Sequence, residues 1–394
     1  MLNQLRLVAV LLVAASLVAC SSADQWTTET VDPDGVRVVD NGPFPDQWTG
    51  SLPILTLLDV WHIEGWDGGL FGRRPSRPFL SVSPSEDIGV AERDPPALHI
   101  FDSDGHHLWQ VGRSGAGPGE FATPRLLEVH PELGWILSEA MTPRIHIFDF
   151  WGNLVNTKTL AQLPRAQWHR GFYLGESRSV WYYASESVTR GNEHAFDYHL
   201  YWTNLDTIDA IRVATFEHPS NQTRGNRRYL PWEHPTVLEV DGGGNAWTCF
   251  DIDYEIDVYS SGGEDHWRIR KQAQDVDFDR AYRERIAEEW LWERDGTREY
   301  ILLPEHQPHI AAMNWTADNE MWVFTSTWVD SPLVQIDVFT AEGKYVRAFL
   351  ADRSLSGAWI GGGIIVRGAT AVDGSPLLVK SKYSFDRGRQ ALER

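Results

Sequence analysis

The chain has 394 residues, of which 42% are hydrophobic and 23% are charged, a composition that is ordinary for a globular protein. Its 35 Lys and Arg against 55 Asp and Glu give a formal net charge of −20 at pH 7. Because nucleic acids and anionic lipid headgroups are bound through Lys and Arg, this charge argues against a nucleic-acid partner and against attachment to a membrane by surface charge.

Residues 1–19 predict a lipoprotein signal peptide. Arg6 gives a basic start, and the apolar run Leu7–Ala19 has 13 residues, too few to span a bilayer as a helix. The run ends in Leu-Val-Ala-Cys at Cys20, which resembles the lipobox of bacterial lipoproteins. The alternative is an ordinary secretory signal in which Cys20 is incidental. The resemblance implies that Cys20 carries the only membrane attachment, on the exported side of the cell envelope.

By the same resemblance, Ser21 after the cysteine favours the outer membrane if the host has one. Residues 20–35 are polar and predict a tether that ends in a turn at Asp32–Gly35. The other cysteine, Cys249, has no disulfide partner in the mature chain and sits in an apolar run, so we expect it to be a small buried hydrophobe.

From residue 36 onward, strand-length alternations recur between Gly, Pro, Asp and Asn clusters. The tetrapeptide His-Ile-Phe-Asp occurs at 99–102 and again at 146–149, with looser copies at 256–259 and 336–339. In each copy a Gly follows four residues after the aromatic, as a turn with positive φ requires. Self-similarity at this spacing predicts a repeat architecture.

Within the repeated strand, the alternation of residues separates two faces. Leu98, Ile100 and their counterparts are expected on one side; the polar residues of the other side are His99, His146, Asp257 and Asp337.

The repeats predict an all-β fold, a six-bladed β-propeller over residues 36–394. The sixth unit is expected to lack outer strands. Two spare runs, Val36–Val39 and Ile54–Val60, would pair with it and close the ring. The first strands of the six units are expected at 79–82, 126–129, 171–174, 237–240, 311–315 and 369–372.

One segment departs from the β pattern. Phe278, Tyr282, Ile286 and Trp290 recur every four residues, which predicts a short helical insertion near 275–294.

The stretch 98–149 contains Phe-Asp-x-x-Gly, Gly-Arg-x-Gly-x-Gly-Pro-Gly-Glu-Phe and a second Phe-Asp. It resembles the NHL-repeat type of bacterial six-bladed β-propeller, and in particular exported propeller lipoproteins without an assigned activity. The resemblance implies a binding scaffold and does not imply an enzyme. We expect the partner to be an envelope protein or glycan, and we assign no cofactor. A purely structural assembly component is not distinguished from this by the sequence.

Loops that leave second strands and crossings between units are expected to share one face around the channel mouth, where partners would bind. Charge and aromatic character there suit a polar neutral or cationic ligand. The residues of this predicted partner-binding face are Arg113, Glu120, Glu139, Arg144, Asp251, Asp253 and Trp328.

The alternative is a metal-dependent propeller enzyme of the lactonase or lyase kind. A ring of carboxylates in the channel could hold Ca²⁺ through oxygen atoms, although a solvated acidic rim explains the same residues. The sequence has no Gly-x-Ser-x-Gly and no His-Glu-x-x-His, and we assign no catalytic residue. The alternative metal ligands are Glu92, Glu139, Asp251, Asp253 and Asp330.

The lipobox resemblance generates a first prediction. Replacing Cys20→Ser removes the acylated side chain, and we expect the protein to leave the membrane fraction or to retain its signal peptide, because several acyl chains hold a lipoprotein firmly. Membrane fractionation and the mass of the mature chain measure this. Unchanged fractionation of a variant whose signal peptide has been removed would refute the anchor.

Overall fold

The computed structural model describes residues 27–42, 52–66, 69–139, 144–159, 168–174, 178–190, 193–207, 209–223, 226–227, 237–249, 253–273, 293–294, 297–298, 308–325 and 333–386. The signal peptide and Cys20 lie outside these ranges. Within them the chain is all-β, as predicted, with one 3-10 turn, η2 (Arg353–Gly357), and no helix that is long and apolar enough to cross a membrane.

The predicted helical insertion falls almost entirely outside the described residues. Its last two residues form the short strand β23 (Glu293–Arg294), which pairs with β24 (Thr297–Arg298).

Most strands form antiparallel groups of four in chain order. The first two groups are β6 (Leu80–Val82), β7 (Ile88–Arg93), β8 (Pro96–Phe101), β9 (His107–Val111), and β10 (Pro124–His130), β11 (Gly134–Glu139), β12 (Arg144–Phe148), β13 (Leu154–Thr159). The next two are β14 (Trp168–Leu174), β15 (Ser179–Arg190), β16 (Glu193–Asn204), β17 (Ile211–Thr223) with the short β18 (Asn226–Arg227), and β19 (Val237–Val240), β20 (Ala246–Cys249), β21 (Glu255–Tyr259), β22 (His266–Lys271). They are followed by β25 (Ile310–Trp315), β26 (Met321–Thr325), β27 (Leu333–Phe339) and β28 (Tyr345–Asp352).

The final group combines both ends of the chain. It contains β29 (Trp359–Gly361), β30 (Ile364–Thr370), β31 (Pro376–Asp386) and the N-terminal strand β3 (Ile54–Ile63). A small hairpin of β4 (Gly65–Trp66) and β5 (Gly69–Leu70) follows β3.

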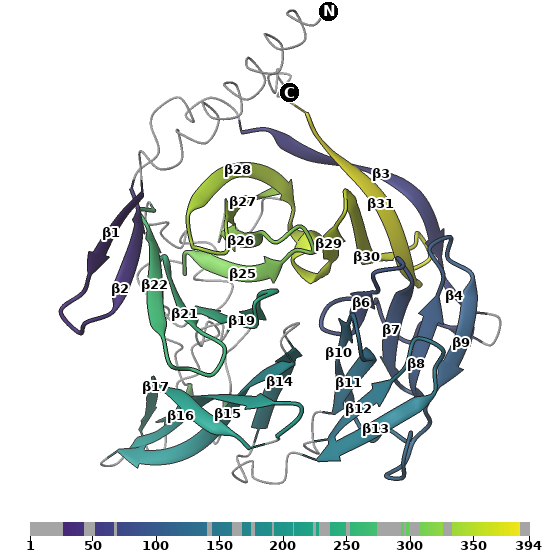
Figure 1. Ribbon diagram of the computed structural model, residues 1–394, viewed down its shortest axis with the longest axis horizontal. Coiled ribbons are helices and arrows are strands. Elements are labelled where there is room, and N and C mark those ends of the chain that lie inside the picture. Colours follow the sequence, from purple (N-terminus) through teal and green to yellow (C-terminus); the bar gives the residue numbers. More distant parts are fainter. Residues whose placement is uncertain are drawn as a thin grey trace, which may run out of the picture.

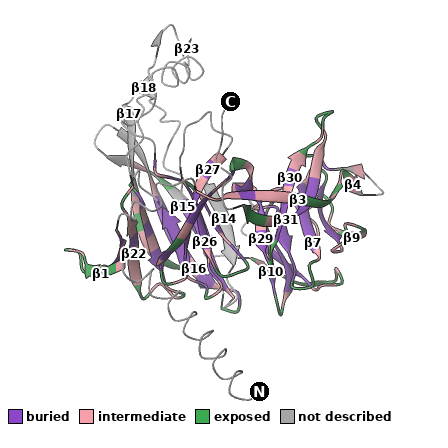
Figure 2. Cartoon of the chain, turned by 90° about the horizontal axis from the view of Figure 1, so that it is seen from above, coloured by how far each residue is buried: buried purple, intermediate pink, exposed green. Residues whose placement is uncertain are grey.

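The groups stand around a common axis, with the first strand of each group nearest the centre (Figure 1). Successive inner strands contact one another, from β6 to β10, β14, β19 and β25, and β29 contacts β6. Buried side chains of neighbouring groups form shared hydrophobic clusters. Figure 2 shows that the strands of these groups consist largely of buried and half-buried residues. This radial arrangement of sheets is that of a β-propeller.

The turn that follows each third strand explains the repeated Asp and Gly. The Asp102 carboxylate accepts the backbone N–H groups of Asp104 and His106 at 2.9 and 2.8 Å, and Gly105 has φ of 89°. Asp149 and Gly152 repeat this geometry, with φ of 88° at the Gly. The motif is therefore a hairpin signal, in which the side chain of Asp fixes the turn that Gly allows.

The last group differs from the predicted sixth unit. Its first strand is β29, so residues 369–372 lie at the end of the second strand, β30, and in the turn after it. The prediction missed β29 because three glycines, Gly361 to Gly363, follow its apolar residues and gave the segment the composition of a loop. The C-terminal segment therefore supplies three strands, and one N-terminal strand completes the group.

That N-terminal strand is β3, which pairs antiparallel with β31 over Ile54–Ile63. The other spare run has a different partner from the expected one. The strand β2 (Arg37–Asn41) lies parallel to β22 on the outside of the fourth group, and it carries β1 (Thr27–Val31) as a further edge strand. Part of the expected tether is thus a strand.

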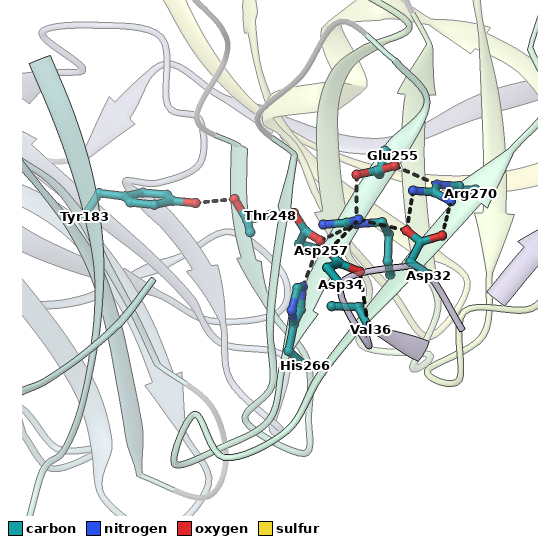
Figure 3. A network of polar contacts seen from close by, with 10 residues as sticks. Asp32, Asp34, Val36, Tyr183, Thr248, Glu255, Asp257, His266 and Arg270 are labelled. Carbon is teal, nitrogen blue, oxygen red and sulfur yellow. Dashed lines mark hydrogen bonds and ion pairs between the residues drawn. The ribbon is translucent and has the colours of Figure 1, made fainter. Parts of the chain in front are cut away.

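Ion pairs explain why the β1–β2 hairpin lies on β22 (Figure 3). The Arg270 guanidinium contacts both oxygens of Asp32 at 2.8 and 2.6 Å, and Arg268 reaches Asp32 at 3.1 Å. Glu255 accepts from Arg270 at 2.7 Å on the other side. The hydrogen bonds from Arg270 lower the pKa of Asp32. Bidentate pairs of this kind fix orientation as well as supplying attraction.

Closure of the ring by β3 generates a second prediction. Leu55 is 6% exposed and packs against the core around Trp322 and Phe349, whereas Leu58 on the same strand is 71% exposed. We expect Leu55→Ala to lower the free energy of unfolding by about 2–4 kcal/mol and Leu58→Ala by less than about 0.5 kcal/mol. Urea denaturation measures both, and equal losses would contradict the role of β3 in the core.

Candidate functional site

The Gly-rich crossing between β9 and β10 is held together by its own charges. Glu120 accepts from Arg113 at 2.7 Å and from the backbone N–H of Gly117 at 2.9 Å. A Cβ on Gly115 would lie 2.1 Å from a Glu120 oxygen, and one on Gly112 would collide with the Phe121 ring. The glycines therefore allow the loop to fold over Glu120, and they form no phosphate-binding turn.

Glu139 and Arg144 lie beside this crossing and are also paired. Glu139 is fully buried and contacts Arg144 and the His146 ring, each at 2.8 Å. Arg144 donates to the carbonyl oxygen of Ala116 at 2.7 Å, which ties the second group to the crossing. Four residues of the predicted partner-binding face thus lie together, with Glu139 buried in the fold and Glu120 paired with Arg113 at the surface.

The other predicted residues are placed differently. Asp253 is exposed next to Tyr254 and lines a separate cavity of about 700 Å³ with Arg270 and Lys271. Asp251, Trp328 and Asp330 lie outside the described residues. The structure therefore brings Arg113, Glu120, Glu139 and Arg144 together and sets Asp253 apart from them.

The alternative metal ligands do not gather in the part of the chain that is described. Glu92 is buried near Gly72, and burial raises the pKa of its carboxyl to about 7 against the opposing effect of Arg73. No group of three or more His, Cys, Asp or Glu side chains within the described ranges is arranged to hold a metal ion.

Three polar residues of the repeated third strand, His146, His199 and Asp337, are buried and have polar partners. The His146 ring contacts Glu139 and the Thr157 hydroxyl, and His199 contacts Glu186 and the Thr215 hydroxyl at 3.1 and 3.0 Å. Asp337 accepts from the Tyr254 hydroxyl and from Lys271 of the preceding group. These residues stabilise contacts within and between groups and are not exposed to a ligand.

A larger cavity, of about 890 Å³, lies on the axis. It lies at the end of the channel where first strands turn into second strands, which is the opposite end from the loops that leave second strands. Its walls come from inner strands and their turns in five of the groups. The residues that line it include Arg77, Glu86, Glu128, Asp241, Trp315, Asp318 and Trp359, together with Gly242, Gly243, Gly361 and Gly362.

Inside this region one guanidinium joins four segments. Arg77, which precedes β6, donates through Nη1 to Asn314 Oδ1 at 2.6 Å and through Nη2 approaches Glu128 at 3.5 Å and Glu239 at 3.2 Å. Asn314 also donates to the carbonyl oxygen of Ala358 at 2.6 Å. We name Arg77, Glu128, Glu239 and Asn314 the axial cluster.

The acidic members of the axial cluster resist ionisation. Burial raises the pKa of Glu239 to about 7; Arg77 opposes this change and the charge of Glu128 adds to it. Burial also raises the pKa of Glu128, again against the effect of Arg77. When Glu128 and Glu239 are both ionised, the cluster has two negative charges and one positive charge, that of Arg77. Repulsion between the two like charges at short range disfavours this state.

The other carboxylates of the wall already have partners. Asp241 accepts from Asn245 and from the Trp247 ring, and Asp318 accepts from the Gly362 N–H at 2.9 Å. Glu86 is paired with Lys380 at 2.8 Å. Glu128 and Glu239 differ from these carboxylates in sharing a single guanidinium, that of Arg77.

Sequence reasoning missed the axial cluster, although a signal was present. The tripeptide Leu-Glu-Val occurs at 127–129 and again at 238–240, in two first strands. In the pairing registers Glu128 lies opposite Ile136, Glu239 opposite Trp247, and Asn314 opposite Trp322, so all three occupy the same place in their groups. Comparing first strands rather than third strands would have found them.

Comparison with known proteins identifies no family. No family model matches the chain, and no curated protein matches it. Among solved structures, similar chains include one from Bacteroides fragilis described as an exported protein, at 10% identity and a TM-score of 0.49, covering 88% of this chain and 99% of that one.

Two enzymes are similar at the same remote level. Virginiamycin B lyase of Staphylococcus aureus has 12% identity and a TM-score of 0.40 over 83% of this chain and 98% of its own. The PQQ-bound aldose sugar dehydrogenase of Streptomyces coelicolor has 12% identity and a TM-score of 0.43 over 84% of this chain and 98% of its own. Likenesses this distant carry no inference about activity.

The axial cluster generates a third prediction. Because the pKa of Glu239 is raised from 4.5 to about 7, the folded chain keeps a proton that the unfolded chain releases. The stabilisation is complete below about pH 4.5 and is lost as pH rises to about 7. Relative to Glu239→Gln, we expect wild-type stability to fall over this window by up to about 1.4 kcal/mol per pH unit.

Urea denaturation at several pH values between about 4.5 and 7 measures the difference. The matched control is Glu342→Gln, a change at an exposed turn residue, which should leave the profile parallel to wild type. Parallel profiles for wild type and Glu239→Gln would contradict the raised pKa.

Proposed function

We propose that this chain is a six-bladed β-propeller lipoprotein of the cell envelope, anchored through Cys20, that binds a glycan in its axial cavity. The observation that carries the proposal is the combination, in one cavity of about 890 Å³, of two tryptophans, glycine backbone and the carboxylate of Glu128, which shares Arg77 with Glu239. The strand groups around the axis support the blade number, and the lipobox resemblance supports the location.

The cavity walls suit a ring-shaped polar ligand. Trp315 and Trp359 are partly buried, and Trp315 is held from behind by Trp247 at 5.4 Å between ring centroids, so its position is fixed before a ligand arrives. Ligand sites characteristically combine apolar walls with a few placed polar groups, and the stated volume lies within their usual range. Sugar rings present apolar faces to aromatic side chains and hydroxyl groups to carboxylates and backbone N–H groups.

A small polar ligand fits this site better than a protein surface does. The cavity is concave and axial, whereas most protein–protein interfaces use a broad surface with a buried centre and a polar rim. The predicted partner-binding residues of the crossing between β9 and β10 are engaged in internal ion pairs, so a partner would have to compete with those contacts.

Tryptophan fluorescence tests the proposal, and it generates a fourth prediction. We expect titration with tetra-N-acetylchitotetraose or cellotetraose to change the emission saturably, and expect Trp359→Ala to weaken binding at least about tenfold, as truncation of a central aromatic contact does.

The matched control is Trp151→Ala, since Trp151 is 79% exposed in an outer turn. Removing the Trp151 ring should leave the affinity for the oligosaccharides unchanged. Thermal melting of both variants checks that the fold is retained. Absence of saturable binding for both oligosaccharides and for the amine-bearing chitotetraose would overturn the proposed function.

A further inference from the structure

We infer that the glycan carries a primary amine and that Glu128 and Glu239 bind it as an ammonium. This inference rests on the proposed function, since it names the chemical class of the ligand in the same cavity.

The charge balance of the axial cluster is the first step. Arg77 approaches Glu128 and Glu239 through the same nitrogen, Nη2, at 3.5 and 3.2 Å, so the two carboxylates share one donor group. Its other terminal nitrogen is directed to neutral acceptors, Asn314 Oδ1 and the carbonyl oxygen of Trp315. With both glutamates ionised, the cluster has two negative charges against one positive charge, and a second cation would balance it.

The position of the carboxylates is the second step. Glu128 lines the cavity on β10, and Glu239 stands at the equivalent place on β19, with its side chain 10% exposed. The Oε2 atom of Glu239 also accepts the backbone N–H of Trp315 at 3.5 Å, which links the cluster to the aromatic wall. Since Trp315 and Glu128 line the same cavity, we expect a sugar packed on Trp315 to bring a ring substituent toward the two carboxylates.

The chemistry of the cation is the third step. An ammonium group has three N–H donors and no acceptor, and it can donate to a carboxylate from each of two strands at once. An acetylated amine has one N–H donor and no charge, so it would leave the negative charge of the cluster uncompensated. The site should therefore distinguish an amino sugar from its N-acetylated form.

A calorimetric comparison of two oligosaccharides that differ only in acetylation tests this inference. At neutral pH, we expect the wild-type protein to bind chitotetraose at least about tenfold more tightly than tetra-N-acetylchitotetraose, since removing one partner of a buried charge contact costs more than about 1.4 kcal/mol. We expect the preference to shrink to within about twofold in Glu128→Gln and in Glu239→Gln, and to persist in Glu342→Gln.

The outcomes separate the two proposals. Equal affinity of the wild-type protein for both oligosaccharides, or a preference that survives in both cavity variants, overturns the amine inference and leaves glycan binding standing. If the wild-type protein binds neither chitotetraose nor tetra-N-acetylchitotetraose, the amine inference is wrong. If it also fails to bind cellotetraose, the proposal of glycan binding is wrong as well. The wild-type comparison needs no variant, so it decides the inference even if a Gln variant fails to fold.

Discussion

The pairing of β3 with β31 is the contact on which the arrangement of the sheets depends, because it joins residues from the two ends of the chain in one group of strands. An open ring would leave sheet edges and apolar faces without a neighbour, and exposed edges invite aggregation. β3 also meets β28 at the pair Leu350 and Ile54, so the final group is continuous with the one before it. Every inner strand is then held at a fixed place around the axis, which is what allows residues from distant parts of the sequence to meet there.

Buried polar groups between the sheets add specificity to this arrangement. Glu139, His146 and Thr157 connect in one network, and Asp337 accepts from Lys271 of the neighbouring group. A buried polar atom without a partner is costly, so each such network penalises a shifted alignment of strands. The same principle places the hairpin of β1 and β2, where Asp32 meets Arg268 and Arg270 on the outer edge of the fourth group (Figure 3).

The axial cluster differs from these networks in how its carboxylates ionise. Hydrogen bonds from Arg270 lower the pKa of Asp32, whereas burial raises the pKa of Glu128 and of Glu239, which share Arg77. A structural ion pair would be stronger with one carboxylate and a bidentate geometry. Burying a second carboxylate beside one arginine lowers stability, and this cost is understandable if the cluster binds a ligand. The difference favours the axial cluster over the Gly-rich crossing as the candidate site.

The sequence by itself determined the local structure. The period of two in strands such as Leu98–Phe101, the turn formed by Asp102 and Gly105, and the repeat of this pattern at Asp149 follow from backbone geometry, so they can be recognised without knowing the fold. These features were sufficient to predict an all-β repeat protein. They were not sufficient to place β29, whose glycines resemble a loop, or to choose between β22 and β31 as the neighbour of β2.

Only the tertiary structure decided which residues share a site. Arg77, Glu128, Glu239 and Asn314 are separated by up to 237 positions, and they meet because their groups converge on one axis. Their shared place in first strands is visible as a repeated Leu-Glu-Val, but the direction of those side chains depends on which strand is innermost. Glu139, selected for its position after a second strand, is buried in a network with Arg144 and His146, whereas Asp253, selected on the same ground, is exposed. A sequence shows which side chains alternate on a strand, whereas the closure of the ring decides which of the two faces meets a neighbour and which strand faces the cavity.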